Sequence, residues 1–554
     1  MSAPVLQHHY KQTEIVDFVI VGCGASGSVL AHQLSHNGFS VVVLEQRPWL
    51  RANQFSHDEY RVKSQSLLTN DQLKQPTTFR KTPKDEAKKQ PALVYGRLVG
   101  GGPVHFTANY WRFHEVDFIE ASKRGTVAGT GFADWPITYA DLEPYYTKAE
   151  WELGISGQAG ASPFDPPRST PYPLPPMPVK SSGVLFEQAA RKLGYHPFPA
   201  PVAVISRPYK GRMACQHCGF CEGFGCEMQA KSSPLPTLIP EAVGGGRCEI
   251  RPESYASEIK VNRQGRTTGV VYFDNPGRQN FQRARAVIVA ANGAETPRLL
   301  LLSKSSHFPD GLANSSGLVG KYLMFNTISF CGGLFEHPLN EYKSIQVTRV
   351  IQDHYEIDPQ LGFYGGGGID ARFQFAPIEF ALAGLPPHQP HWGSDYKKAL
   401  QKYYTHSMYL MGHGTSLPLA DNSISLDASV KDSWGQPAIC VTYRDHPDDL
   451  KTAKFFEDRS MELLDAAGAL DKWVAFPVTE QNVGFHLLGT CRMGKDPKTS
   501  VINPDHRTHD VANLFLCDGS SFVTSGRGQP TETIQALAFR AADRISTLAK
   551  KNEI

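Results

Sequence analysis

The residues that most restrict the fold are 17–45, DFVIVGCGASGSVLAHQLSHNGFSVVVLE. Residues 18–21 form an apolar run that predicts a buried strand, and residues 25–37 have the periodicity of a helix. A second strand is expected over residues 40–45. A strand, a glycine-rich turn, a helix and another strand in this order predict a βαβ unit with parallel strands.

Three glycines in this unit have the G-x-G-x-x-G spacing of dinucleotide-binding turns. Gly22 allows the tight turn, Gly24 lets the backbone approach a pyrophosphate, and Gly27 lets the helix pack closely on the strand. The N-terminus of the helix offers free N–H groups to phosphates. Glu45 closes the second strand at about the spacing of a carboxylate that accepts a hydrogen bond from a ribose hydroxyl. These residues predict a dinucleotide site without distinguishing FAD from NAD.

Length and charge narrow the class of protein. The 554 residues are enough for two large domains or about three smaller ones. Hydrophobic residues make up 41% of the chain and charged residues 20%, which is typical of a soluble globular protein. The formal net charge of +2 does not favour nucleic acid as a partner. No apolar run is long enough to span a membrane, and the polar first residues lack an export signal. We therefore expect a chain that is cytoplasmic or is exported by a partner.

Other segments add ligand-binding turns. Three consecutive glycines at 100–102 exclude a stable helix or strand interior and let the backbone approach a ligand. The segment from Ala284 predicts a buried strand, a turn of small residues, and a helix that starts near Thr296 with Pro297 at its first position. A further buried strand starts at Asn513 and ends in Asp-Gly, and a helix closes the chain.

Four of the ten cysteines, Cys215, Cys218, Cys221 and Cys226, lie within the stretch CQHCGFCEGFGC. Their C-x2-C-x2-C-x4-C spacing is close to that of thiolates that hold an iron–sulfur cluster, but it differs at the last gap and lacks the proline that follows there. Structural zinc is the alternative, although zinc sites usually join two separated pairs. Disulfides within so short a loop would be strained. We predict a 3Fe-4S or 4Fe-4S cluster, with Cys218 as the spare thiol if three suffice.

Several motifs in order resemble one known family. The chain is similar over nearly its whole length to the glucose–methanol–choline (GMC) family of FAD oxidoreductases. The matching segments are the N-terminal unit, the glycines at 100–102, AANGAETP, FHLLGTCRMG at 485–494, and the C-terminal helix with TIQALA. Within the family the chain most resembles the catalytic subunits of bacterial membrane-associated sugar and gluconate dehydrogenases, through stretches such as CGFCEGFGCEM and NSSGLVGKYLM.

The resemblance implies an α/β fold, with a Rossmann-like FAD-binding domain and an α+β substrate domain that has an antiparallel sheet. The FAD-binding domain is expected to be discontinuous, at residues 1–325 and 480–554, with a lid or insertion at 51–95 and the cysteine segment at 205–235. Residues 326–479 would form the substrate domain. The predicted FAD-binding residues are Gly22, Gly24, Gly27, Glu45, Gly100, Gly101, His105, Asn109, Ala291, Asp518 and Gly519.

The resemblance also implies catalytic residues. His486, in GFHLLGTCRMG, matches the catalytic histidine, and a histidine suits the base that takes a hydroxyl proton. The second active-site position is usually His or Asn, but here it is Gln529, which can orient a hydroxyl and cannot act as a base. Phe485 and the stretch YLMFN at 322–326, which replaces a family Asp-His, also depart from the sugar dehydrogenases. A histidine at the position of His105 is covalently bound to the flavin in some relatives, so the resemblance implies either a covalent link to FAD at His105 or a loop histidine beside the flavin ring.

We predict an FAD-dependent dehydrogenase that oxidises a CH–OH group of a sugar, sugar acid or polyol and passes electrons through an iron–sulfur cluster to a protein. The resembling enzymes imply a small chaperone-like subunit and a cytochrome c or another electron-accepting subunit. They also imply a periplasmic, membrane-associated location. Two alternatives remain: an oxidase or lyase of the same fold with structural zinc, and a flavin-bound relay subunit without a substrate. The setting of His486 disfavours the relay subunit.

Overall fold

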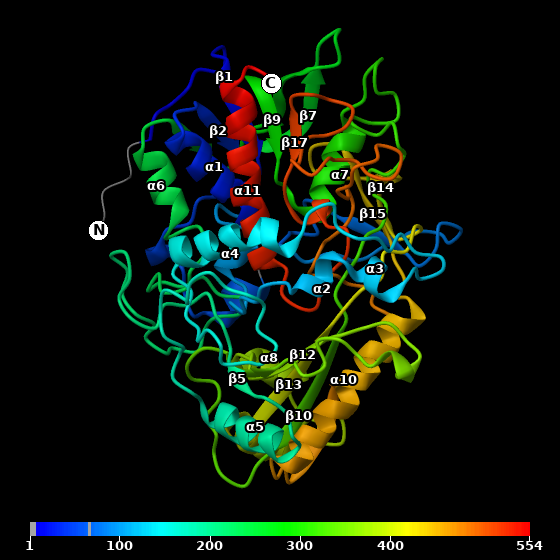
Figure 1. Cartoon of the computed structure of the whole chain (residues 1–554). Helices are drawn as coiled ribbons and strands as arrows, with labels where there is room; N and C mark the ends of the chain where they lie inside the picture. The colour runs from blue at the N-terminus through cyan, green and yellow to red at the C-terminus, as the bar shows by residue number, and fades with distance from the viewer. Residues whose placement is uncertain (1–6, 65–67) are drawn as a thin grey trace.

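The predicted βαβ unit lies at the centre of a seven-stranded sheet in the upper half of the molecule (Figure 1). β1 (Val16–Val21) pairs in parallel with β2 (Val41–Leu44) and, on its other side, with β9 (Gln279–Val289). α1 (Ala25–His36) connects β1 to β2. Alternate β1 side chains enter two different apolar clusters, because both faces of the sheet are covered. The prediction of a strand, a helix and a parallel strand is confirmed.

The same sheet joins distant parts of the chain. Its order is β6-β2-β1-β9-β8-β7, with β17 in parallel beside β9. The remaining strands are β6 (Cys248–Arg251), β7 (Tyr255–Val261), β8 (Thr267–Phe273) and β17 (Leu514–Leu516). A C-terminal strand therefore completes a sheet that begins near the N-terminus. This computed structural model describes residues 7–64 and 68–554; residues 1–6 and residues 65–67 of the predicted insertion lie outside the described part.

Helices from both ends of the chain cover the sheet. α11 (Thr531–Lys550) packs against α1 and against α4 (Tyr139–Leu153), and α6 (Leu238–Gly244) lies beside α1 (Figure 1). The fully buried alanines 538, 541 and 542 lie on the face of α11 that meets the core. The predicted C-terminal helix is thus confirmed as part of this core.

The predicted start of one helix was wrong. α7 (Asn292–Leu302) begins at Asn292 and not near Thr296, because the Asn292 side-chain oxygen accepts hydrogen bonds from two N–H groups of the first turn. Pro297 therefore lies inside the helix and leaves the Gly293 carbonyl without its usual N–H donor. The Thr490 hydroxyl donates to that carbonyl instead, at 2.6 Å.

A second sheet of six strands fills the lower half of the molecule, and all its pairings are antiparallel (Figure 1). α10 (Pro447–Ala466) and α5 (Ser181–Lys192) pack on it. In order its strands are β16 (Asp471–Phe476), β10 (Ile328–Leu334), β13 (Ser407–Gly414), β12 (Gly367–Arg372), β11 (Val347–Ile351) and β5 (Phe198–Pro199). The antiparallel sheet is confirmed, while the domain boundaries stay a prediction.

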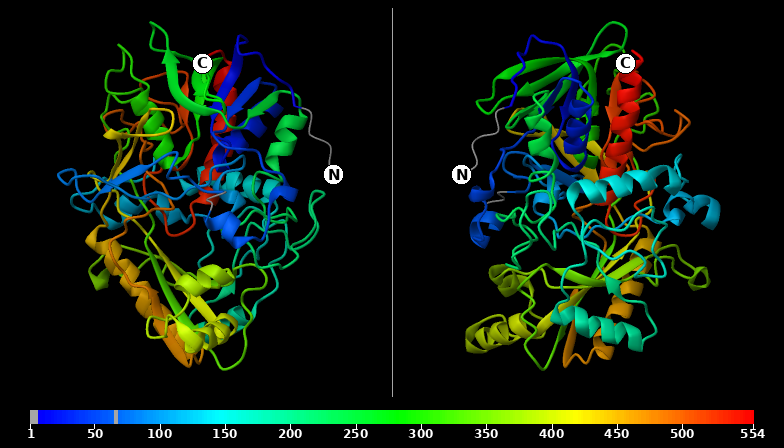
Figure 2. Two further views of the ribbon diagram at one scale, coloured as in Figure 1. Left: turned by 180° about the vertical axis from the view of Figure 1, so that it is seen from behind. Right: turned by 60° about the vertical axis from the view of Figure 1, so that its left-hand side comes forward.

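A third, smaller sheet joins two distant parts of the chain, which the colour bar of Figure 2 places in the blue and the yellow ranges. It pairs β14 (Ser423–Lys431) and β15 (Pro437–Thr442) with β3 (Thr77–Arg80) and β4 (Lys88–Lys89) of the predicted insertion. The other α-helices are α2 (Glu115–Phe118), α3 (Glu120–Arg124), α8 (Pro377–Ala383) and α9 (Gly393–His406). Short helices of other types are η1 (Ala52–Gln54), η2 (Tyr60–Ser64), η3 (Gly102–Val104), η4 (Pro359–Leu361) and η5 (Gly519–Ser521). Over residues 7–64 and 68–554, none of the helices has the length and apolar character that crossing a bilayer requires.

Gly27→Ala should destabilise the protein by about 1–3 kcal/mol, the usual cost of overpacking. A Cβ on Gly27 would lie 2.0 Å from the Gly22 carbonyl oxygen, so α1 would have to move off β1. Chemical denaturation monitored by circular dichroism gives the free energy of unfolding. Gly245→Ala is the control, because Gly245 is exposed, has right-handed helical backbone, and has no neighbour closer than 3.7 Å to an added Cβ. Equal stability of the two variants would contradict close packing at Gly27.

Candidate active site

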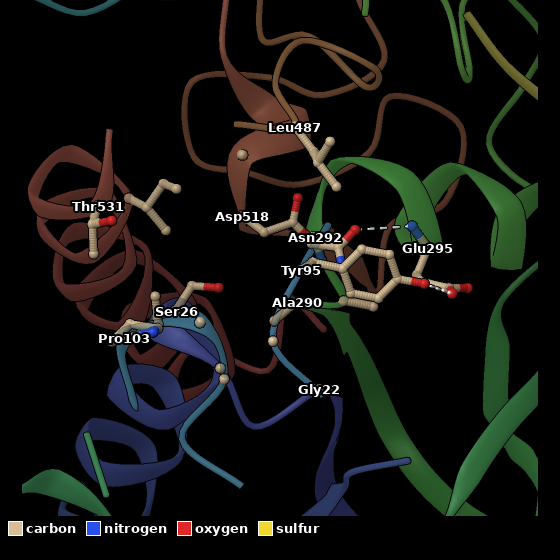
Figure 3. A pocket seen from close by; sticks show the side chains of 18 of the residues that line it. Gly22, Ser26, Tyr95, Pro103, Ala290, Asn292, Glu295, Leu487, Asp518 and Thr531 are labelled. Carbon is tan, nitrogen blue, oxygen red and sulfur yellow. Dashed lines mark hydrogen bonds between the residues drawn. The ribbon is translucent and has the colours of Figure 1, made fainter. Parts of the chain in front are cut away.

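A cavity of about 370 Å³ lies at the carboxyl ends of β1 and β2, beside the N-terminus of α1 (Figure 3). Segments far apart in the sequence form its walls, including the glycine turn after β1, the loop at 101–107 and the segment at 485–488. The predicted site residues that line it are Gly22, Gly24, Glu45, Gly101, His105, Ala291, His486, Asp518, Gly519 and Gln529. The structure thus brings most of the predicted FAD and catalytic residues to one place.

The two glycine loops touch at this cavity. The Gly100 N–H donates to the Cys23 carbonyl at 2.8 Å, and a Cβ on Gly101 would lie 2.5 Å from the Gly24 Cα. Gly101 also has φ +62°, a left-handed conformation that favours glycine. Gly24 and Gly101 therefore present bare backbone to the cavity, which permits the close approach that a pyrophosphate needs.

The Glu45 carboxylate also holds the first glycine turn in place. It accepts a hydrogen bond from the Cys23 N–H at 2.9 Å, and burial raises its pKa to about 7. Because Glu45 also lines the cavity, contact with a bound ribose remains a prediction.

Three predicted FAD-binding residues are not among those that line the cavity: Gly27, Gly100 and Asn109. Gly27 packs α1 on the preceding turn, and Gly100 joins the two glycine loops. The buried Asn109 donates its side-chain N–H to Asp370 at 3.0 Å. The structure therefore gives these residues supporting positions behind the cavity wall.

Asp518 connects the end of β17 to the start of α7. Its carboxylate accepts hydrogen bonds from the Thr296 hydroxyl at 2.6 Å, the Ser520 N–H at 2.8 Å and the Asn292 N–H at 3.1 Å. Burial raises the pKa of Asp518. At the same wall the Tyr95 hydroxyl donates to Glu295 at 2.5 Å (Figure 3). The sequence analysis did not identify Tyr95 or Glu295, whose pairing spans distant parts of the chain.

The orientation of His486 is fixed by Asn326. The Asn326 amide nitrogen donates to the Gly414 and Gly526 carbonyls, at 3.0 and 3.3 Å, so its oxygen faces His486. His486 Nδ1 lies 2.9 Å from that oxygen and must therefore carry a hydrogen. Burial, with His413 nearby, lowers the pKa of His486 to about 4. His486 is therefore neutral at pH 7, and the lone pair on its Nε2 can accept a proton.

Gln529 is held by a buried histidine that the sequence analysis missed. His413 Nε2 lies 2.8 Å from Asp370 Oδ2 and 3.0 Å from Arg372 Nη2, and His413 Nδ1 lies 3.1 Å from Gln529 Nε2. Although burial opposes ionisation, the Arg372 guanidinium holds the pKa of Asp370 well below its usual range. Burial lowers the pKa of His413. The ionised Asp370 can only accept and is nearer to Nε2 than the Arg372 donor is, while Gln529 Nε2 can only donate. Neutral His413 therefore donates from Nε2 to Asp370 and accepts from the Gln529 amide, which leaves the Gln529 oxygen free for the cavity.

His105 lines the cavity from the second glycine loop, directly after η3. Its Nε2 is buried and has no hydrogen-bond partner. Burial and the Lys231 ammonium lower the pKa of His105 to about 4, so the imidazole is neutral and nucleophilic. These features suit a covalent link to flavin, which stays a prediction.

The loop of the four cysteines, residues 215–226, is called the cysteine loop. It packs directly against the loop that carries His105. The Gly223 N–H donates to the His105 carbonyl at 2.7 Å, and the buried Lys231 ammonium donates to the Cys221 and Val104 carbonyls, at 2.5 and 3.2 Å. Glu222, from the same loop, lines the cavity and has a buried oxygen without a partner. The cysteine loop and the cavity therefore share a wall.

The four thiols of this loop are free, with Cys218 exposed and the other three half-buried. In the described part of the chain, no group of three or more His, Cys, Asp or Glu side chains is arranged to hold a metal ion. The thiols match an iron–sulfur cluster in number and chemistry, but their arrangement gives that cluster, and the zinc alternative, no support.

The lining of the cavity suits an FAD molecule. The bare backbone of the two glycine loops suits its pyrophosphate, and the unpartnered polar atoms of His105 and Glu222 could be satisfied by a bound polar group.

Comparison with known proteins identifies the family. The family models for GMC oxidoreductase match residues 16–325 (N-terminal model) and 418–538 (C-terminal model).

The chain belongs to the GMC oxidoreductase family. A relative, the 2-methyl-1,2-propanediol dehydrogenase of Mycolicibacterium austroafricanum, is 34% identical over 96% of this chain and 95% of its own length. The fructose dehydrogenase large subunit of Gluconobacter japonicus is 29% identical over 97% of this chain and 98% of its own. The solved pyridoxine 4-oxidase from Mesorbium loti shares the fold, with a TM-score of 0.63, 17% identity, and 95% and 98% of the chains covered.

Membership of this family makes the protein an FAD-dependent oxidoreductase that acts on CH–OH groups. The family resemblance predicted from the motifs is confirmed, and so is the fold class. Membership does not by itself assign a role to each side chain. His486 and Gln529 share the cavity, as expected for a catalytic pair, and their roles stay a prediction.

His413→Phe should raise KM by about 3–10-fold, the value of one hydrogen bond, with a smaller change in kcat. The variant keeps a planar aromatic ring and removes both the acceptor that orients Gln529 and the donor to Asp370. Steady-state kinetics of the holoenzyme would be compared for His413→Phe, Gln529→Ala and the double variant. If His413 acts through Gln529, the double variant is no worse than Gln529→Ala. Fully additive effects would contradict this positioning role.

Proposed function

We propose that the protein is an FAD-dependent dehydrogenase for a CH–OH group of a sugar, sugar acid or related polyol. The observation that carries the proposal is that neutral His486 and the Gln529 amide share a cavity suited to FAD. The names of the two relatives, a diol dehydrogenase and a fructose dehydrogenase, support polyhydroxylated substrates. Phe485 lines the same cavity and gives it an apolar part, which favours a substrate with a hydrocarbon portion.

The proposed mechanism assigns separate tasks to the two side chains. The Gln529 oxygen accepts a hydrogen bond from the substrate and orients the carbon that reacts. His486 Nε2 takes the hydroxyl proton as the C–H bond breaks, because its Nδ1 hydrogen is already committed to Asn326. FAD bound in the cavity supplies the acceptor for the hydride. The glycine loops and His105 would hold that cofactor.

His486→Ala should lower kcat by about 10²–10⁴-fold while FAD stays bound, since this is the usual contribution of a general base. Turnover with an artificial electron acceptor and the flavin absorbance of the same sample test both points. His307→Ala, at an exposed histidine, is the matched control and should keep normal turnover. Near-normal turnover of His486→Ala would show that another group takes the proton.

The pH dependence of kcat/KM also tests whether His486 is the base. Because the pKa of His486 is lowered to about 4, Nε2 is free above that pH and protonated below it. In the wild type, kcat/KM should therefore stay high as pH falls from 6.5 and decrease only near pH 4. A decrease of kcat/KM near pH 6.5 that disappears in His486→Gln would mean that burial does not lower the pKa of His486.

We also propose that electrons leave through the cysteine loop to a protein acceptor. The support is the four thiols and the shared wall between this loop and the cavity. Cys215, Cys221 and Cys226, with or without Cys218, would hold an iron–sulfur cluster, which supplies one-electron transfer when bound. A cytochrome c or similar acceptor and a small chaperone-like subunit belong to this proposal, because one relative is named a large subunit. A periplasmic location at the membrane is also part of this proposal.

Cys221→Ser should abolish reduction of a cytochrome or quinone while substrate still bleaches the flavin. Iron and acid-labile sulfide would be measured in anaerobically purified wild type and in the variant. Cys218→Ser is the control, because Cys218 is exposed and is the predicted spare thiol. A wild type without iron, or a folded Cys221→Ser variant that reduces the protein acceptor at the original rate, would refute electron exit through this loop.

A further inference from the structure

The surface of α8 and α9 carries large apolar side chains that face outward. Leu382 and Trp392 are 82% and 85% exposed, and Ile378 is 47% exposed. Neighbouring side chains on the same helices, Phe380 and Tyr403, are buried in the core below. The exposed side chains therefore do not complete the core. We call Leu382, Trp392 and Ile378, together with Lys397, Lys398 and Lys402, the α8–α9 surface.

Hydrogen bonds hold this surface in a defined shape. The Tyr396 hydroxyl donates to the Ala381 carbonyl at 2.7 Å, which ties the first turn of α9 to the end of α8. Trp392 immediately precedes α9 and Leu382 lies near the end of α8, so this contact places both at one junction. The Glu59 carboxylate accepts from the Ile378 and Glu379 N–H groups, both at 2.7 Å, which anchors the start of α8.

The charges beside these apolar side chains are mainly positive. α9 carries exposed Lys397, Lys398 and Lys402 against one acidic residue, Asp395, which lies 3.0 Å from Lys398. On α8, Glu379 is neutralised by an ion pair with Lys63. Lysine chains can extend beside an apolar layer while their ammonium groups reach polar headgroups, and tryptophan favours the membrane–water interface.

We propose that the α8–α9 surface docks this enzyme on a membrane that contains anionic phospholipid. Leu382, Trp392 and Ile378 enter the headgroup region, and the three lysines contact lipid phosphates. This contact is made by the chain itself and is separate from any attachment through partner subunits. Exposed apolar and cationic groups on the neighbouring helices α8 and α9 fit a lipid surface better than a neutral protein partner, which needs no cationic groups.

Docking in this way brings the cysteine loop close to the membrane. Ala376, directly before α8, packs with Phe224 of that loop and Val62 in one apolar cluster. A membrane held against α8 therefore lies on the side of the molecule that carries the cysteine loop. This placement would shorten the path of electrons to an acceptor in the membrane, although docking does not depend on a cluster being present.

The test is cosedimentation of the holoenzyme with vesicles of phosphatidylcholine, with and without phosphatidylglycerol. Wild type should bind the anionic vesicles and be released by high salt. Leu382→Ser/Trp392→Ser should weaken partitioning at least about tenfold, because two large apolar side chains are lost. Lys397→Gln/Lys398→Gln/Lys402→Gln should lose about fivefold per lysine and the dependence on phosphatidylglycerol. All variants should keep dye-linked turnover, because none of these residues lines the cavity.

Leu73→Ser is the matched control, since Leu73 is 91% exposed but lies outside the α8–α9 surface. It should bind vesicles like wild type. Absence of wild-type binding, or equal binding by Leu382→Ser/Trp392→Ser, would overturn the proposal. Sedimentation velocity without vesicles distinguishes a protein occupant: self-association that Leu382→Ser/Trp392→Ser abolishes would identify a second copy of this chain and would also overturn it.

Discussion

The contact between the two glycine loops is the constraint on which the site depends. Gly24 and Gly101 can approach closely only because neither has a side chain, and the Gly100–Cys23 hydrogen bond holds them together. This contact sets the distance between the βαβ unit and the loop that carries His105. The cysteine loop then packs on the second glycine loop. A chain that could not make this contact would have both loops but no shared cavity.

The candidate active site combines two neutral histidines with different fixed tautomers. Asn326 can orient His486 only because two backbone carbonyls hold its amide nitrogen, and His413 can orient Gln529 only because Asp370 takes its other ring hydrogen. The two carbonyls come from β13 and from the segment before Gln529. The lower sheet therefore does more than enclose substrate, since it determines which nitrogen of each histidine is available.

The sequence predicted features that depend on neighbours along the chain. The βαβ unit, the glycine turns and the C-terminal helix all have local signals, and the order of motifs indicated the family. His413 had no such signal, because its partners Asp370 and Gln529 lie 43 and 116 residues away. Asn326 was not singled out, although the stretch YLMFN that contains it was noticed as a departure from relatives, and its partner His486 is 160 residues distant. The start of α7 was misplaced because Pro297 is tolerated there only through Thr490, from a distant segment.

The buried ammonium of Lys231 has a mechanical consequence. It donates hydrogen bonds to the Cys221 and Phe224 carbonyls of the cysteine loop and to the Val104 carbonyl of the loop that carries His105. Three carbonyl dipoles share one cation, so neither loop can shift without stretching hydrogen bonds in the other. The cysteine loop and the loop that carries His105 are therefore joined through this one ammonium group. Because Val104 directly precedes His105, a shift of either loop would disturb hydrogen bonds next to this histidine.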